Sequence, residues 1–151
     1  MALKKALELA PGHPEAAIHL AWRLAQQGDP KAAREILLSV REEERSTDHW
    51  KRLGRLAAGA GEDDVAVDCY TRAGLSDPND RQVYDELWKV TALRKRFGAF
   101  NAAVAKILEA HDRAWWAHYY LGFSRLDDGK PKEALAEFRL AAELNPELMS
   151  A

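Results

Sequence analysis

The sequence predicts an all-α protein, a solenoid of stacked antiparallel helix pairs, and two observations lead to this fold class. The first is a pair of amphipathic segments between Trp115 and Pro146, where small and apolar residues recur at the spacing of one helix face. The second is a repeat, because a step back of 68 residues takes Gly129 to Gly61 and Phe138 to Tyr70. Half of that step, 34 residues, is a period typical of stacked-repeat solenoids.

Turn residues separate the two halves of each predicted hairpin. Gly129 can take the left-handed conformation that ends a helix, and Pro131 suits the first turn of the next one. In the first repeat, Asp29 is placed to cap the helix that starts at Pro30, and Ser46 can cap the following helix. Short turns of this kind predict antiparallel neighbours throughout the chain.

The order of landmark residues resembles that of the tetratricopeptide repeat (TPR) family. A Leu-Gly pair is followed by a second glycine, an alanine, an aromatic residue, another alanine and a proline, here Leu121, Gly122, Gly129, Ala134, Phe138, Ala141 and Pro146. The resemblance covers nearly the whole chain and implies that residues 1–151 form a single right-handed superhelical array.

Four full repeats are expected within this array, at about 14–46, 47–80, 81–114 and 115–148. A half repeat over 2–11 precedes them, which suggests either a piece of a longer protein or a short natural cap. TPR arrays usually end with an extra helix, and Glu147–Ala151 is too short to form one. The outer face of the last hairpin is therefore expected to be exposed, covered by a partner, or covered by further sequence.

The third repeat is degenerate. Trp88 stands where the other repeats have a small residue, and the basic run Arg94–Arg96 interrupts the pattern. The segment Gly98–Ala103 then restores the pattern about three residues late. We therefore expect a longer first helix, a distorted turn and a shortened second helix in this repeat.

Composition narrows the function classes. Hydrophobic content of 47% and charged content of 30% suit a soluble helical protein. A net charge of −2 argues against binding to nucleic acid, and no apolar run approaches the length of a membrane span. Cys69 is the only cysteine, so an internal disulfide is impossible, which favours a cytoplasmic location.

No catalytic or metal-binding constellation is visible, so we predict neither enzymatic activity nor a cofactor. The five histidines do not stand at the four-residue spacing that places two ligands on one helix face: His13, His19, His49, His111 and His118. Cys69 has no recognisable base beside it and is interpreted as an inert, partly buried thiol.

A concave groove is the remaining candidate site, since the first helices of TPR repeats line such a face. The positions that the resemblance places there are Ile18, Trp22, Lys51, Arg55, Asp85, Lys89, Trp116, Tyr119 and Phe123. This stripe is apolar at both ends and basic in the middle, which suits a peptide with an acidic segment between hydrophobic anchors. The alternative is that the aromatic residues only fill space within the superhelix or mark where a capping helix would dock.

The carboxylate clamp of chaperone-binding TPR proteins is predicted to be absent. Its lysine, asparagine and arginine positions correspond, from the second repeat, to Lys51, Arg55, Glu86, Trp116 and Tyr120. Counted from the first repeat they correspond to Ile18, Trp22, Arg52, Gln82 and Glu86. Only scattered members match, and Glu86 would repel a terminal carboxylate.

The sequence thus predicts a non-enzymatic protein–protein interaction scaffold that holds a protein or peptide partner in its concave groove. Two alternatives remain open. The chain could be a regulatory or targeting segment of a larger protein or enzyme. It could also self-associate as a homodimer through its C-terminal repeat.

Overall fold

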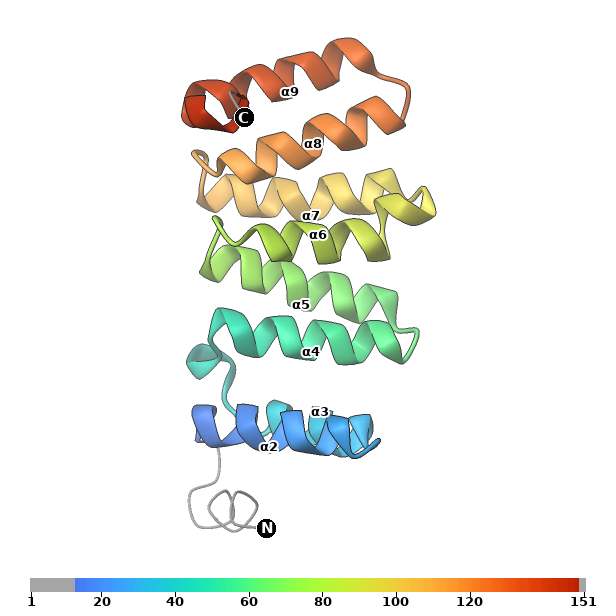
Figure 1. Cartoon of the computed structure of the whole chain (residues 1–151), viewed down its shortest axis with the longest axis vertical. Coiled ribbons are helices and arrows are strands. Elements are labelled where there is room, and N and C mark those ends of the chain that lie inside the picture. The colour runs from blue at the N-terminus through green and yellow to red at the C-terminus, as the bar shows by residue number, and fades with distance from the viewer. Residues whose placement is uncertain (1–12, 150–151) are drawn as a thin grey trace.

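The computed structural model describes residues 13–149, and its helices form a stack of antiparallel pairs (Figure 1). The four pairs are α2 (Pro14–Gln26) with α3 (Pro30–Leu38), α4 (Thr47–Gly59) with α5 (Asp63–Ser76), α6 (Arg81–Val90) with α7 (Phe97–Ala110), and α8 (Trp115–Asp127) with α9 (Pro131–Leu144). Short 3-10 helices lie at Glu42–Glu44, Ala92–Arg94 and Pro146–Met149. The predicted all-α solenoid is confirmed, and the expected half repeat over 2–11 lies outside the described residues.

Capping side chains set the helix starts. The Asp29 carboxylate accepts a hydrogen bond from the Ala32 amide at 3.1 Å, and the Ser46 hydroxyl accepts one from the His49 amide at 3.2 Å. Both residues therefore satisfy backbone donors that the first helical turn leaves without partners. These two predicted caps are confirmed.

Glycines in the left-handed conformation close most of the hairpin turns. Gly28, Gly61 and Gly129 have φ angles of 83°, 79° and 77°, a region that side chains with a Cβ enter only at a steric cost. Pro131 occupies the first turn of α9, as predicted from its fixed φ. The reversal of direction is thus encoded locally in the sequence.

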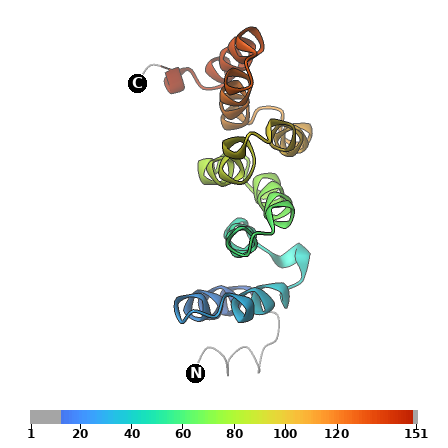
Figure 2. The same cartoon turned by 90° about the vertical axis from the view of Figure 1, so that its right-hand side faces the viewer.

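The helix pairs turn progressively about the long axis of the stack. In Figure 2, α4 and α6 lie on one side and α5 and α7 on the other, while the helices of the first pair run across the view. The first helices of the repeats (α2, α4, α6 and α8) therefore share one side of the molecule, which we call the first-helix face. The second helices form the opposite side.

One hydrophobic core runs through most of the stack. It includes residues from α2 to α8, with Tyr70, Tyr84 and Phe100 among its fully buried side chains. Each hairpin contributes an apolar stripe to its neighbours, so the core is continuous although no single hairpin encloses one.

Glycine permits the closest helix contacts in the second and fourth repeats. A Cβ atom built on Gly54 would lie 2.5 Å from Cε1 of Tyr70, and one on Gly122 would lie 2.5 Å from Cε1 of Phe138. Both distances are shorter than a carbon–carbon contact permits. In these two repeats the first helix leaves a gap, and an aromatic ring of the second helix fills it.

The third repeat corrects part of the sequence prediction. Helix α6 has 10 residues where α4 and α8 have 13, so the first helix is shorter rather than longer. Thr91, with φ −130° and ψ −83°, ends α6, and its hydroxyl donates to the Leu87 carbonyl. A 3-10 turn then replaces the missing helical turn. The predicted distortion of the turn is confirmed.

The second helix of this repeat is neither late nor shortened. Helix α7 begins at Phe97, which is 34 residues after the start of α5 and 34 before the start of α9, and all three helices have 14 residues. Lys95, not Gly98, takes the left-handed position, with φ 62°. The expectation of a three-residue delay was wrong because it treated Gly98 as the turn residue.

Large and small side chains exchange places in the third repeat. Trp88 takes the position of Gly54 and Gly122, Val104 that of the aromatic residue, and Phe100 that of the buried alanines Ala66 and Ala134. The Trp88 and Phe100 rings pack edge to face with centroids 5.3 Å apart. The same space is therefore filled from the opposite helix.

Candidate functional site

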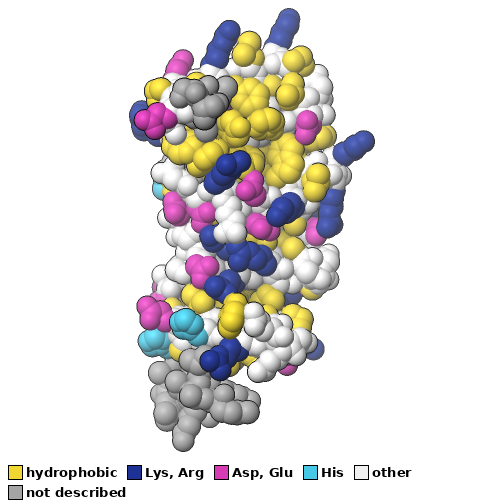
Figure 3. All heavy atoms as spheres, viewed as in Figure 1, with side chains coloured by type: hydrophobic (Ala, Val, Ile, Leu, Met, Phe, Trp, Pro, Cys, Tyr) yellow, Lys and Arg dark blue, Asp and Glu magenta, His cyan; other side chains and the backbone are white. Residues whose placement is uncertain are grey.

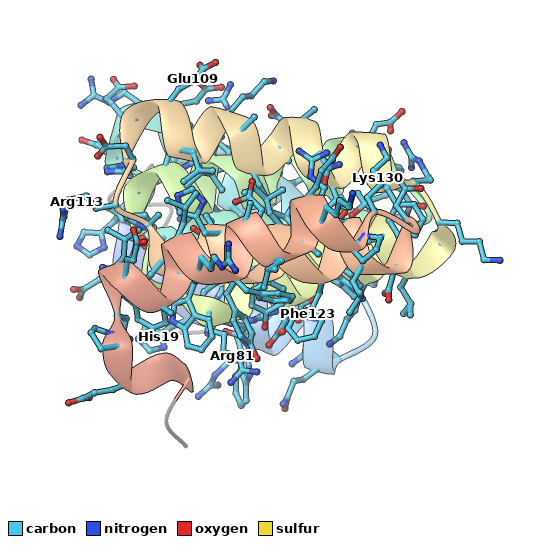
Figure 4. All side chains as sticks on the ribbon, turned by 90° about the horizontal axis from the view of Figure 1, so that it is seen from above. His19, Arg81, Glu109, Arg113, Phe123 and Lys130 are labelled. Atoms are coloured by element: carbon cyan, nitrogen blue, oxygen red, sulfur yellow. The ribbon has the colours of Figure 1, made fainter. Side chains whose placement is uncertain are left out.

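The first-helix face carries all nine residues predicted to line the groove. Figure 4 shows His19 of α2, Arg81 of α6 and Phe123 of α8 on this side, with Glu109 of α7 on the opposite side. In Figure 3 hydrophobic side chains gather over the C-terminal repeats, and charges of both signs cross the middle of the face. The chemistry of the face therefore changes along the stack.

An aromatic cluster forms its C-terminal part. Tyr119 packs edge to face against Phe123, with ring centroids 5.0 Å apart, and also contacts Trp116 at 5.5 Å. Phe138 from α9 supports the cluster, 5.1 Å from Phe123. Phe123 remains 38% exposed, so this cluster presents apolar surface to solvent and also fills the interior.

A polar network joins α6 to α8 beside these rings. Arg81 Nε donates to the Tyr120 hydroxyl at 3.1 Å, and that hydroxyl donates to the Asp85 carboxylate. The Arg81 guanidinium also lies 4.8 Å from the centre of the Trp116 ring, a cation–π distance. Burial is the main cause that raises the pKa of Tyr120 to about 12, so this hydroxyl keeps its proton. Asp85 and Arg81 are therefore occupied within the protein.

A shallow hollow of about 270 Å³ adjoins the network. Asp85 and Trp88 from α6 and Tyr120 and Phe123 from α8 line it. Two of the predicted groove residues, Asp85 and Phe123, thus come together across neighbouring repeats. The only charged lining residue is Asp85, and its carboxylate already accepts a hydrogen bond.

Lys51 connects repeats within the stack. Its Nζ lies 2.7 Å from the Asp80 carboxylate and 3.0 Å from the Gln82 side-chain oxygen, and its side chain is only 13% exposed. Asp80 is also the N-cap of α6. The expected basic middle of the groove is therefore weaker than the sequence pattern indicated, because this cation bridges α4 to the start of α6.

A second hollow, of about 210 Å³, lies between the first and second repeats. Its apolar walls come from α2, α3 and α4: Ala21, Trp22, Ala25, Leu37 and Leu56. Arg52 and Arg55 complete the lining, and Trp22 is 50% exposed. We call this the Trp22 hollow.

The two remaining predicted residues differ in exposure. Ile18 is half-buried and packs against the main core, so most of it is structural. Lys89 is exposed and lies 3.7 Å from the Glu86 carboxylate, a surface pair with little energetic weight.

Four residues of the face were not among the predicted site residues: Arg52, Arg81, Trp88 and Tyr120. Arg52 and Tyr120 lie one position after Lys51 and Tyr119, on the adjacent stripe of the same helices. The 34-residue period places Arg52, Glu86 and Tyr120 at equivalent positions, and this signal was available in the sequence. Arg81 had no such signal, because it acts through a ring and a hydroxyl from another repeat.

The groups capable of chemistry are otherwise buried or paired. Cys69 is buried, and desolvation raises the pKa of its thiol to about 11. His118 Nδ1 lies 2.8 Å from the Glu137 carboxylate, and this hydrogen bond raises the pKa of the imidazole. Within residues 13–149, no three His, Cys, Asp or Glu side chains gather as metal ligands.

Within the described range, every helix is too short or too polar to cross a bilayer.

Comparison with known proteins identifies the sequence pattern and the fold. A profile of the tetratricopeptide repeat family matches residues 1–56. A search among curated proteins found no match.

Several solved structures resemble the chain over most of its length. The crystal structure of MamA is 22% identical, covers 99% of this chain and 88% of its own, and superimposes with a TM-score of 0.62. YrrB, described as a TPR protein with an unusual peptide-binding site, is 19% identical, with coverages of 97% and 76% and a TM-score of 0.59. A MamA from Desulfovibrio magneticus is 19% identical, with coverages of 88% and 76% and a TM-score of 0.55.

These likenesses agree with the hairpin geometry described above. The start of the chain carries the sequence pattern of the tetratricopeptide repeat family, and the described chain has the fold of a tetratricopeptide repeat solenoid.

Proposed function

We propose that the chain is a protein–protein interaction scaffold that binds a segment of another protein on its first-helix face. The observation that carries this proposal is the exposure of large apolar side chains there, Trp22 at 50% and Phe123 at 38%, each beside a hollow. Aromatic side chains that are half exposed beside a recess are the residue type that dominates binding energy in protein interfaces.

The fold supports the same role. A stack of hairpins offers an extended surface on which successive repeats each contribute a few side chains. YrrB, which has the same fold, is described as having a peptide-binding site. The proposal assigns no chemical step to the chain, because its thiol and its imidazole–carboxylate pair act in packing between helices.

Site-specific photocross-linking tests which side of the stack binds. A benzoylphenylalanine residue replaces Lys89, exposed on α6, in one variant and Lys106, exposed on α7, in a matched control. Irradiation in a lysate of the source organism should give a discrete adduct from position 89 and none from position 106. Adducts from position 106 alone would place the binding surface on the second helices and contradict the proposal.

Self-association is a second candidate, favoured by apolar exposure on the last hairpin. Leu126 on α8 and Leu135 and Leu140 on α9 are all exposed, Leu135 at 50%. Light scattering across a range of concentrations should show a dimer in the unchanged protein and a monomer in the double variant Leu135→Glu with Leu140→Glu. Lys132→Glu, exposed on the same helix, is the control, and a monomer at every concentration would contradict this candidate.

A further inference from the structure

The charged groups of the first-helix face differ in whether they are already used. Asp85, Arg81 and Lys51 all have close partners in neighbouring helices. Arg55 has none: within residues 13–149 no acceptor lies within hydrogen-bond or ion-pair distance of its guanidinium. A half-buried guanidinium without a partner beside an apolar recess is a site for an anionic group.

Arg52 adds a second cation to the same recess. Its Nε donates to the Asp48 carboxylate at 2.9 Å, one helical turn away, which fixes the side chain. No described residue accepts a hydrogen bond from its terminal nitrogens. The charged residues that line the Trp22 hollow are therefore both arginines, and no carboxylate lines it.

The volume of the hollow sets the size of the apolar group that fits. An apolar cavity of about 150 Å³ is known to hold a benzene ring. The Trp22 hollow measures about 210 Å³, so it accommodates one aromatic or branched aliphatic side chain. Trp22 would cover that side chain with its indole ring, and Leu37 and Leu56 would contact it from α3 and α4.

We infer that the Trp22 hollow binds an internal peptide segment in which a large hydrophobic residue stands next to Asp or Glu. The hydrophobic side chain enters the hollow, and the neighbouring side-chain carboxylate pairs with Arg55, supported by Arg52. This inference rests on the proposed function and adds the chemistry of the partner.

The lining favours a side-chain carboxylate over a chain terminus. Proteins capture terminal carboxylates in nests of free backbone amides. Ala21, Trp22, Arg52 and Arg55 lie inside α2 and α4, where backbone amides are used within the helices. A guanidinium fork needs no such nest, since it pairs with a carboxylate through its own two donors.

Selection from a random 12-residue peptide library displayed on phage, with the whole chain as bait, tests the inference. The enriched peptides should combine a large hydrophobic residue with an adjacent acidic one. Their synthetic versions should bind about 30-fold more weakly to Trp22→Ala, as expected when an aromatic anchor is truncated. Amidating the C-terminus of each peptide should leave its affinity unchanged.

A graded series at position 55 isolates the carboxylate contact. Affinity should fall slightly in Arg55→Lys, about tenfold in Arg55→Gln and most in Arg55→Glu. Lys106→Glu makes the same charge reversal on the exposed side of α7 and should leave the affinity unchanged. Circular dichroism of each variant ensures that weaker binding is not caused by unfolding.

Phe123→Ala distinguishes failure of this inference from failure of the proposed function. Peptides that lack acidic residues, survive Arg55→Glu and lose affinity in Phe123→Ala would overturn the inference and keep the first-helix face as the binding surface. Peptides unaffected by any of these variants would overturn both. If no sequence is enriched over empty beads, the inference is overturned, and the cross-linking experiment still decides the proposed function.

Discussion

The third repeat and its two neighbours fill the same space in opposite ways. In the second and fourth repeats a glycine on the first helix receives an aromatic ring from the second helix. In the third repeat Trp88 occupies the glycine position, and Val104 replaces the ring. The comparison teaches that the repeat conserves total volume at an interface, while the helix that supplies the large side chain can change.

The largest effect is expected where the exchange is buried most deeply. Phe100 is fully buried and takes the place of an alanine in the neighbouring repeats. Phe100→Ala should lower the free energy of unfolding by about 3–5 kcal/mol, because it leaves a cavity that the helices cannot close. Chemical denaturation measures this loss.

A triple variant tests the exchange itself. Trp88→Gly, Phe100→Ala and Val104→Tyr together give the third repeat the pattern of its neighbours. The triple variant should lose less stability than the sum of the three separate changes, because the new ring fills the space that the others vacate. Strict additivity would show that the three positions do not share one space.

Alanine at the two glycines separates a rigid neighbour from a yielding one. Tyr70 is fully buried against Gly54, whereas Phe138 is partly exposed beside Gly122. Gly54→Ala should therefore cost about 2–3 kcal/mol and Gly122→Ala about 1 kcal/mol. Equal costs would contradict the idea that burial of the ring decides whether it can move.

The turn of the third repeat predicts a change of opposite sign. Lys95 has φ 62°, the conformation that glycine supplies at Gly61 and Gly129, and a Cβ there costs about 1–2 kcal/mol. Lys95→Gly should stabilise the protein by about 0.5–1 kcal/mol after the added freedom of the unfolded chain is subtracted. Gly129→Ala, the reverse change at the equivalent position, should destabilise it by about 1 kcal/mol.

Histidines distinguish the regular repeats from the third in their response to pH. His49 is fully buried, with its Nε2 2.7 Å from the Leu37 carbonyl, and desolvation lowers its pKa. The folded state then binds fewer protons than the unfolded state, so stability from this group is lost as pH falls below about 6.5. Arg45 and Arg52 oppose its protonation, and Asp48 favours it.

His118 has the opposite sign. Its hydrogen bond to Glu137 raises its pKa, so its contribution is complete below about 6.5 and is lost as pH rises through the folded value. The third repeat has Val83 and Tyr84 at the two equivalent positions. Unfolding measured against pH should change least in acid for His49→Gln, and should lose its decline at higher pH for His118→Gln. Identical profiles for both variants would contradict this assignment.

Much of the fold followed from local signals. Gly129, Pro131 and the caps Asp29 and Ser46 each act within one turn of helix, so sequence spacing alone locates them. The third repeat was harder because Thr91 and Lys95 are not residues that ordinarily end a helix or adopt positive φ. Their conformations are imposed by the neighbouring repeats, which hold the second helix in register.

The groove was predictable by position and not by the state of its charges. The 34-residue period places Lys51, Asp85 and Tyr119 on one face, and the structure puts them there. It does not reveal that Asp80 binds Lys51 or that Tyr120 binds Asp85, since those partners come from other repeats. Arg55 has the same charge as Lys51 and differs from it only in lacking such a partner.

The exchanged side chains of the third repeat also bear on how the chain finds its correct pairing during folding. Identical hairpins could pair one repeat out of step and form a compact but wrong stack. Here, a pairing of α6 with α5 as a hairpin would force Trp88 into the space that Gly54 leaves for Tyr70, and α4 with α7 would leave a void beside Val104. Each mistake overfills one interface and empties another, so the irregular repeat favours a single order of assembly.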